Sequence, residues 1–250
     1  MSEQARKAHS RRARERQLVH QERKARALRH REEDVLARVS ERWQRVRRRL
    51  ERIGPGSTTS RLLEVGSGAH GLVFGGHEGA AVGVDPLAAQ YARLFPWQRS
   101  VPTVAAEGEH LPFADRTFGV VVCDNVVDHA EHPAAIVAEM ARVLSLNGLL
   151  YFSVNVHHRL YGLVSAAHRA WNGAGLRFEI RPFADHTVHL SPAQARALFQ
   201  ELPLCVRWDQ THLAEARERA RRRPLWSPRH LPARLFFKNA RFEVIAERVS

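Results

Sequence analysis

Apolar residues follow two distinct patterns along this chain. From residue 61 onward, short apolar runs of strand length alternate with segments whose apolar residues recur at helical spacing. The runs cover residues 62–65, 80–84, 104–105, 119–123 and 149–154, and the helical segments cover 86–94 and 133–144. Buried strands that alternate with amphipathic helices are typical of a doubly wound parallel sheet. The sequence therefore predicts an α/β fold.

The C-terminal part of the chain adds a helix and two more apolar runs. Ser191 and Pro192 provide a helix cap and a proline at the first helical position, which is how many helices begin. The two runs, at 204–208 and 242–249, bring the expected strands to seven.

Residues 1–53 show the second pattern. They contain neither proline nor glycine, and from Leu36 to Ile53 apolar residues recur at alternating steps of three and four. This predicts a helical arm whose narrow apolar stripe packs on the rest of the protein or on a second copy of the chain. Residues 54–60 read as a linker, so residues 61–250 are expected to form the main domain.

Charge is concentrated in the same arm. Residues 1–53 hold 18 of the 39 basic residues and 8 of the 26 acidic residues, which gives the arm +10 of the chain's net charge of +13. Such an arm could contact the phosphates of a nucleic acid, or it could be an ordinary solvated helix.

Composition otherwise points to a cytoplasmic protein. No apolar stretch approaches the roughly 20 residues that a membrane helix needs, so we expect no membrane span. The two cysteines, Cys123 and Cys205, lie far apart in apolar runs, as reduced and packed thiols do.

The candidate chemistry begins at a glycine-rich stretch. The apolar run that ends at Glu64 and Val65 is followed by Gly66, Gly68 and Gly71, which is how a strand leads into a tight loop that faces a nucleotide-type ligand. Asp85 ends the next apolar run, where a carboxylate can accept hydrogen bonds from ribose hydroxyls. These features alone leave two cofactors open, because an NAD-dependent oxidoreductase carries the same glycine spacing.

The blocks downstream favour one of the two. Residues 106–115 read AEGEHLPFAD, residues 118–124 read FGVVVCD, and residues 139–150 read EMARVLSLNGLL. In this order, over residues 61–155, the chain resembles the class I S-adenosylmethionine-dependent methyltransferases. It is similar in particular to the group with "GDAE-LPF" after the third strand and "RVLKPGG" before the fifth.

The resemblance implies a Rossmann-like methyltransferase fold that binds S-adenosylmethionine, with a mostly parallel seven-stranded sheet whose last strand is antiparallel. By position, Glu64 would order the glycine loop and face the amino-acid end of the cofactor, and Asp85 would hold the ribose hydroxyls. Glu107 would reach the adenine amino group, and Asp124 would face the methionine part. The complete set of implied cofactor-binding residues is Glu64, Gly66, Ser67, Gly68, Asp85, Glu107, Gly108 and Asp124. His70 stands where the family usually has a glycine, which puts the backbone conformation of the loop in question.

The acceptor side is less defined. Residues 156–190 are expected to cover the acceptor, and His129 and His157 are candidate general bases because each follows a strand. We expect no metal, since the spacing of Asp185, His186 and His189 is generic. No Asn-Pro-Pro-Tyr-type motif follows the fourth strand, so a small-molecule acceptor is expected. The alternatives are an RNA methyltransferase or non-catalytic nucleic-acid module that uses the basic arm, and thirdly an NAD-dependent oxidoreductase.

Overall fold

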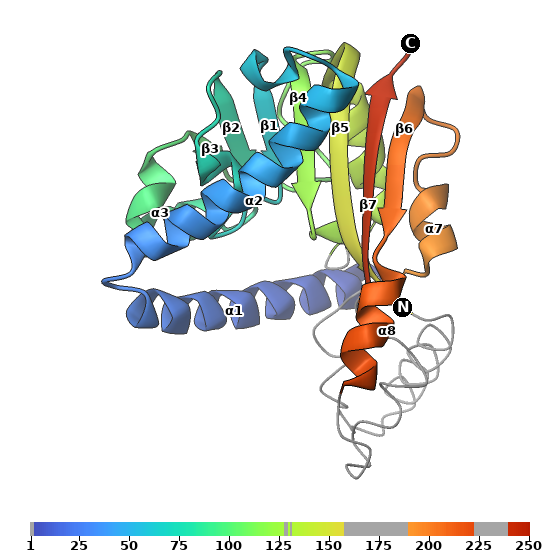
Figure 1. Ribbon diagram of the computed structural model, residues 1–250. Helices are drawn as coiled ribbons and strands as arrows, with labels where there is room; N and C mark the ends of the chain where they lie inside the picture. The colour runs from blue at the N-terminus through green and yellow to red at the C-terminus, as the bar shows by residue number, and fades with distance from the viewer. Residues whose placement is uncertain (1–2, 128–129, 131, 158–189, 223–239) are drawn as a thin grey trace.

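The computed structural model describes residues 3–127, 130, 132–157, 190–222 and 240–250. Its centre is a seven-stranded sheet with the order β3-β2-β1-β4-β5-β7-β6 (Figure 1). The strands are β1 (Leu62–Val65), β2 (Ala81–Val84), β3 (Thr103–Val104), β4 (Phe118–Asp124), β5 (Leu144–Val156), β6 (Leu204–Thr211) and β7 (Ala240–Arg248). The first five pair in parallel, and β7 is antiparallel to both of its neighbours. The predicted fold class is confirmed.

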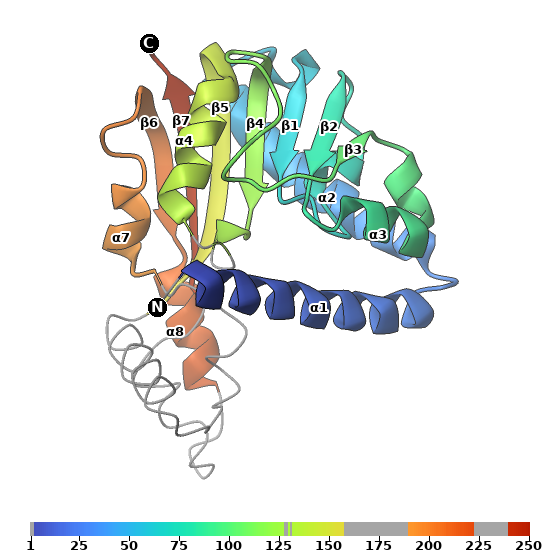
Figure 2. The same ribbon diagram turned by 180° about the vertical axis from the view of Figure 1, so that it is seen from behind.

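Helices cover both faces of the sheet. On one face lie α4 (Pro133–Val143) and α7 (Pro192–Ala197), and across the other runs α2 (Glu32–Ile53) (Figures 1 and 2). The shorter elements are η1 (Ser57–Thr59), η2 (Leu72–Gly75), α3 (Ala88–Leu94), η3 (Pro96–Arg99) and α8 (Leu213–Arg221). Each face of the sheet has its own hydrophobic core, because alternate strand residues point to opposite sides.

The helix α2 fills a gap in one of these cores. Only residues 66–80 separate β1 from β2, and the structure forms there a four-residue 3₁₀ helix, η2, in place of a full α-helix. The stripe of α2 covers the exposed sheet face instead, with Val35, Val39, Trp43, Val46 and Leu50 all buried. A Cβ atom at Gly75 of η2 would lie 2.5 Å from Cβ of Trp43, so only glycine fits beneath the helix.

This packing distinguishes the two surfaces on which the apolar stripe could pack, the rest of its own chain or a second copy. It packs on the sheet of its own chain, and the buried register is one that includes Val35 in place of the expected Leu36, which is only partly buried. The oligomer expected through Leu36–Ile53 therefore has no support from this stripe.

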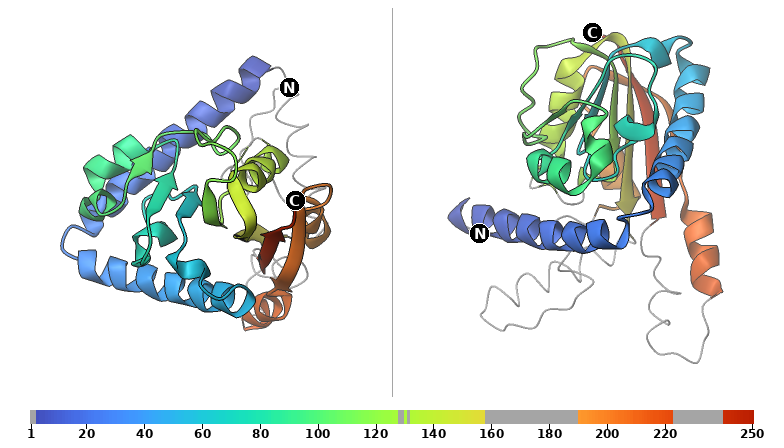
Figure 3. Two further views of the ribbon diagram at one scale, coloured as in Figure 1. Left: turned by 90° about the horizontal axis from the view of Figure 1, so that it is seen from above. Right: turned by 90° about the vertical axis from the view of Figure 1, so that its left-hand side faces the viewer.

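The first helix, α1 (Glu3–Ala27), runs along the edge where the parallel strands end (Figures 1 and 3). Gln21 is buried, and Ala25 and Leu28 pack against the core beneath α2. Among the described residues, no helix is long and apolar enough to cross a membrane.

Candidate functional site

The glycine loop after β1 owes its shape to two glycines. Gly66 has φ 74° and Gly68 has φ 53°, both in the left-handed region that side chains disfavour. A Cβ atom at Gly66 would also lie 2.4 Å from the side chain of Val126, in the loop after β4. The amides of Gly66 and Ser67 both donate to the carbonyl of Val84, at 2.7 and 3.0 Å. The loop is thus tied to β2 on one side and pressed against the end of β4 on the other.

His70, where a glycine was expected, causes no backbone strain. It is absent from the residues with positive φ, because Gly66 and Gly68 make the turn. Its ring packs against Phe95 and Trp97, at 5.2 and 5.4 Å between centroids. Burial, together with the positive charges of Lys24, Arg42 and Arg38, lowers the pKa of His70 to about 4.

Two side chains from η3 hold the same loop from outside. The indole Nε1 of Trp97 donates to the carbonyl of Ala69 at 2.8 Å, and Nε2 of Gln98 donates to the carbonyls of Gly68 and Ala69 at 3.0 and 3.1 Å. Sequence reasoning missed both residues, because nothing about a tryptophan and a glutamine after Pro96 indicates which carbonyls they will reach.

Glu64 supports the loop from below. Its carboxylate accepts from the backbone amides of Leu72 at 2.9 Å and Val73 at 2.8 Å, so it fixes the start of η2. A Cβ atom at Gly71 would lie 2.4 Å from Oε2 of Glu64, which is why the third glycine of the stretch is needed. Burial raises the pKa of Glu64 to about 8, although these two amides and Arg42 oppose the shift. The loop-ordering role expected of Glu64 matches these contacts.

Asp85 sits at the end of β2, beside the turn of the loop. Its Oδ2 accepts from the Gly68 amide at 3.0 Å, and Oδ1 accepts from the Leu87 amide at 2.8 Å. A Cβ atom at Gly68 would meet only the Gly66 carbonyl at 3.9 Å and Asp85 Oδ2 at 4.0 Å, so the space above this glycine is open. Ser67, in contrast, is buried with its side chain against Gly83 of β2.

The loop after β3 is held by α4. Glu139 accepts from the Leu111 amide at 2.8 Å, while Arg142 donates to the carbonyls of Leu111 and Phe113 and pairs with Asp115 at 2.7 Å. Two of the three sequence blocks that carry the resemblance, residues 106–115 and 139–150, are therefore joined by direct contacts. This clamp fixes the path of the segment that carries Glu107 and Gly108.

Gly108 is packed tightly and Glu107 lies next to it, partly buried. A Cβ atom at Gly108 would lie 3.1 Å from Val65 and 3.3 Å from Ile136, so the backbone there runs close over β1. The carbonyl of Glu107 accepts from the His110 amide at 3.1 Å. Both residues thus lie in the loop that follows β3, next to the end of β1.

Asp124, at the end of β4, is surrounded by cationic groups. Arg42 of α2 donates to Oδ2, while Arg241 of β7 and Ser153 of β5 both donate to Oδ1 at 2.5 Å. Its side chain is only 2% exposed. Burial opposes ionisation, but Arg241, Arg42 and the Ser153 hydroxyl together hold the pKa of Asp124 below its ordinary value.

Of the two candidate bases, His157 alone belongs to the part of the chain that the structure describes. His129 lies outside the described residues, as does most of the 156–190 segment and the Asp185, His186 and His189 group. His157 is buried at the end of β5, where its backbone amide donates to the Leu190 carbonyl at 2.9 Å. Within the described part of the chain, no group of three or more histidine, cysteine or acidic side chains could hold a metal ion.

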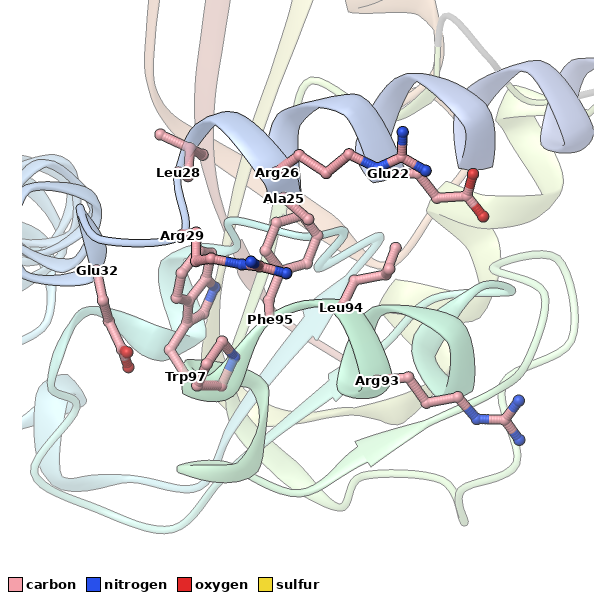
Figure 4. A pocket seen from close by; sticks show the side chains of 11 residues that line it. Glu22, Ala25, Arg26, Leu28, Arg29, Glu32, Arg93, Leu94, Phe95 and Trp97 are labelled. Atoms are coloured by element: carbon pink, nitrogen blue, oxygen red, sulfur yellow. The ribbon is translucent and has the colours of Figure 1, made fainter.

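A cavity of about 490 Å³ lies to one side of the glycine loop, between the end of α1 and the α3–η3 segment (Figure 4). Phe95 and Trp97 line it, with Arg26 and Arg29 on the α1 side. Glu64, Asp85 and Asp124 do not line it, so this cavity is separate from the group of carboxylates at the strand ends.

The chain is similar in sequence to known methyltransferases. A family model described as a methyltransferase domain matches residues 63–152. An uncharacterized methyltransferase of Mycolicibacterium vanbaalenii is 30% identical over 128 residues, which is 50% of this chain and 48% of that protein. The chain thus spans about half the length of the curated relative that it matches.

Two solved structures show the same fold at low identity. A geranyl diphosphate methyltransferase in complex with S-adenosylmethionine is 16% identical, with a TM-score of 0.58 over 84% of this chain and 85% of that one. The [4+2]-cyclase SpnF is 14% identical, with a TM-score of 0.51 over 76% of this chain and 74% of that one. These likenesses establish the architecture, and the second shows that the architecture also serves a reaction of another kind.

Proposed function

We propose that the protein transfers a methyl group from S-adenosylmethionine to a small-molecule acceptor, as the match of residues 63–152 to a methyltransferase-domain model and the likeness of the fold to a geranyl diphosphate methyltransferase support. The observation that carries the proposal is Asp85, whose carboxylate is fixed by the backbone amides of Gly68 and Leu87 at the end of β2, beside the turn that Gly66 and Gly68 make. A carboxylate in this position of an open α/β sheet is the kind of group that accepts from ribose hydroxyls.

The remaining residues fit the same ligand. Gly66 and Gly68 let the backbone approach the cofactor closely, and Glu64 keeps the loop in that conformation. Glu107 would accept from the adenine amino group. The bound cofactor would supply an activated methyl group on a sulfonium. The protein would then align the acceptor with that group and exclude water, which lowers the barrier of an in-line displacement.

A small-molecule acceptor is supported by the neighbouring geranyl diphosphate methyltransferase, whose name states such a substrate. Where the acceptor must lose a proton, His129 and His157 remain our candidate bases. Neither the family model nor the named neighbours favour the nucleic-acid module or the oxidoreductase. Cys123 and Cys205 are both thiols and not disulfides, which is in keeping with the reducing cytoplasm that we propose as the compartment of this protein.

Calorimetric titration of the full chain with S-adenosylmethionine, S-adenosylhomocysteine and NAD tests the proposal. We expect saturable binding of both sulfur nucleosides and none of NAD. Asp85→Ala should weaken S-adenosylhomocysteine binding by roughly 10- to 100-fold, the range expected for losing a charged acceptor of hydrogen bonds. Asp209→Ala is the matched control, because this exposed aspartate lies on β6, at the edge of the sheet opposite β3, where it pairs with Arg196 at 2.8 Å. Absence of heat with both sulfur nucleosides would refute the proposal, and unchanged affinity in Asp85→Ala would refute the ribose assignment.

A further inference from the structure

Two arginines from distant parts of the chain converge where β4 ends. Arg42 comes from α2 and Arg241 from β7, and both donate to the single carboxylate of Asp124. Arg42 also donates through Nη1 to the carbonyl of His70, at 3.2 Å. Arg42 therefore bridges the glycine loop and the end of β4, which is the region expected to receive the amino-acid end of the cofactor.

Asp124 itself cannot serve that end as the sequence suggested. Both of its oxygens already accept from the two arginines and from Ser153, and its side chain is 2% exposed. The arginine side chains are 35% and 41% exposed, so it is they that remain accessible. Each guanidinium has more N–H donors than the contacts described here use.

The charges leave this place net positive. Arg42 and Arg241 share the carboxylate of Asp124, Arg49 adds a third cation beside Glu243, and burial raises the pKa of Glu64 beneath the loop to about 8. Glu243 lies 3.5 Å from Nε of Arg241 but is also engaged by Arg49 at 2.6 Å, Tyr151 at 2.6 Å and His212 at 2.7 Å. An anion is therefore favoured here over the ammonium group of an amino acid.

The arrangement is fixed in advance of any ligand. Tyr151 accepts from Arg241 at 3.1 Å and donates to Glu243, so Arg241 is held on two sides. Arg42 is held by the packing of α2, whose Trp43 is fully buried next to it. Preorganised arginines of this kind lose little side-chain entropy when an anion binds, which favours affinity.

We infer that Arg42 and Arg241 form a carboxylate-binding site that receives the α-carboxylate of the cofactor's amino-acid end, with Asp124 as the buried counterion that positions them. The inference rests on the proposed function and revises one part of it. The residue that the resemblance assigned to the methionine part acts through two arginines that the resemblance did not include.

A pair of ligands that differ only in this group provides the test. Decarboxylated S-adenosylmethionine keeps the sulfonium, the adenosine and the amino group and lacks only the carboxylate. In calorimetry with the full chain, we expect S-adenosylmethionine to bind roughly 10- to 100-fold more tightly than the decarboxylated form, since a charge-assisted contact has about that effect. This comparison needs no variant, so it does not depend on the folding of a mutant.

Variants then locate the effect. Arg42→Gln and Arg241→Gln should each weaken S-adenosylmethionine by roughly 10-fold or more while changing the decarboxylated ligand by less than about 3-fold. Arg42→Lys, which keeps the charge without the planar fork, should fall between Arg42→Gln and the wild type. The control is Arg45→Gln on the same helix, whose exposed side chain pairs only with Glu41 at 3.7 Å and should leave both affinities unchanged.

The outcomes separate the two proposals. If the wild type binds both ligands with equal affinity, or if Arg42→Gln weakens both equally, the carboxylate site is wrong and Arg42 serves only to hold the loop through His70. If the wild type binds neither ligand, the proposed function fails, and the carboxylate site fails with it.

Discussion

The packing of α2 on its own sheet makes a quantitative prediction at Trp43. Its side chain is fully buried between the helix, η2 and the sheet, and an indole of this kind removes about 150–250 Å² from water on folding. Replacement by alanine loses that burial and leaves a cavity beneath the helix. We expect Trp43→Ala to lower the free energy of unfolding by about 3–5 kcal/mol.

Urea denaturation followed by circular dichroism measures this loss, and a thermal scan should show a fall of roughly 6–20 °C in Tm for a chain of this size. Arg45→Ala is the control on the same helix, because its side chain is 56% exposed, and its removal should cost less than about 0.5 kcal/mol.

Two results would refute the reasoning behind this prediction. A loss below about 1 kcal/mol would show that α2 is not part of the core. A wild-type transition midpoint that rises with protein concentration would show that the stripe meets a second copy in solution. The stripe of the arm would then belong to an interface and not to the folded domain.

Three further predictions concern the loop, its histidine and the end of α4. Gly66→Ala should cost at least about 2 kcal/mol, because φ is positive and Val126 lies 2.4 Å from the new Cβ, and Val126→Ala should recover part of that cost in denaturant unfolding. Below pH 6.5 the unfolded chain protonates His70 while the folded protein keeps its ring neutral, so the contribution of His70 to stability is present above pH 6.5 and is lost as pH falls towards 4. His70→Phe should remove this part of the pH dependence. If the free energies of unfolding of the wild type and of His70→Phe change with pH in parallel, the lowered pKa is contradicted. Arg248→Ala should lower the free energy of unfolding by about 2–3 kcal/mol in the same assay, because the guanidinium donates to three carbonyls at the end of α4. The control is Arg207→Ala, which removes an exposed side chain and should lower it little. Equal losses in the two variants would show that the three contacts do not stabilise the fold.

The positions of the central strands could be predicted because β1 and β4 are short, apolar and mostly buried on both faces. The runs at 62–65 and 119–123 need little tertiary context, and β1 and β4 form there with small shifts of their ends. The two tail strands were also found, since residues 244–246 form an apolar core within β7 and β6 follows a capped helix. Periodicity suffices where burial alone decides the structure.

The position of α2 could not be predicted from its own apolar stripe, because such a stripe indicates that the helix packs on another surface but does not identify that surface. The information was in another segment. The stretch between Glu64 and Asp85 is too short and too rich in glycine to hold a long helix, so the sheet face above it required cover from elsewhere. Similarly, the loop geometry attributed to His70 was settled by Gly66 and Gly68.

The role of Asp124 shows a different limit. Its position at the end of β4 follows from the strand pattern, but its partners Arg42 and Arg241 lie 82 and 117 residues away in the chain. A motif specifies the residue and not the ion pairs that a distant helix and strand bring to it. Roles carried over by position are therefore most secure where the contacts are local, as for Glu64 and the amides of η2.

The ion pair between Arg49 of α2 and Glu243 of β7 has a consequence for how the protein is made. The two residues are 194 positions apart, although they lie 2.6 Å from each other in the fold. Ribosomes add about 5–20 residues per second, so α2 leaves the exit tunnel roughly 10–40 seconds before its last contact exists. During this interval the core beneath α2 lacks Ile245, which β7 contributes to it. The nascent chain thus exposes the apolar stripe of α2 early, and its protection from aggregation in the cell depends on how soon β7 is synthesised.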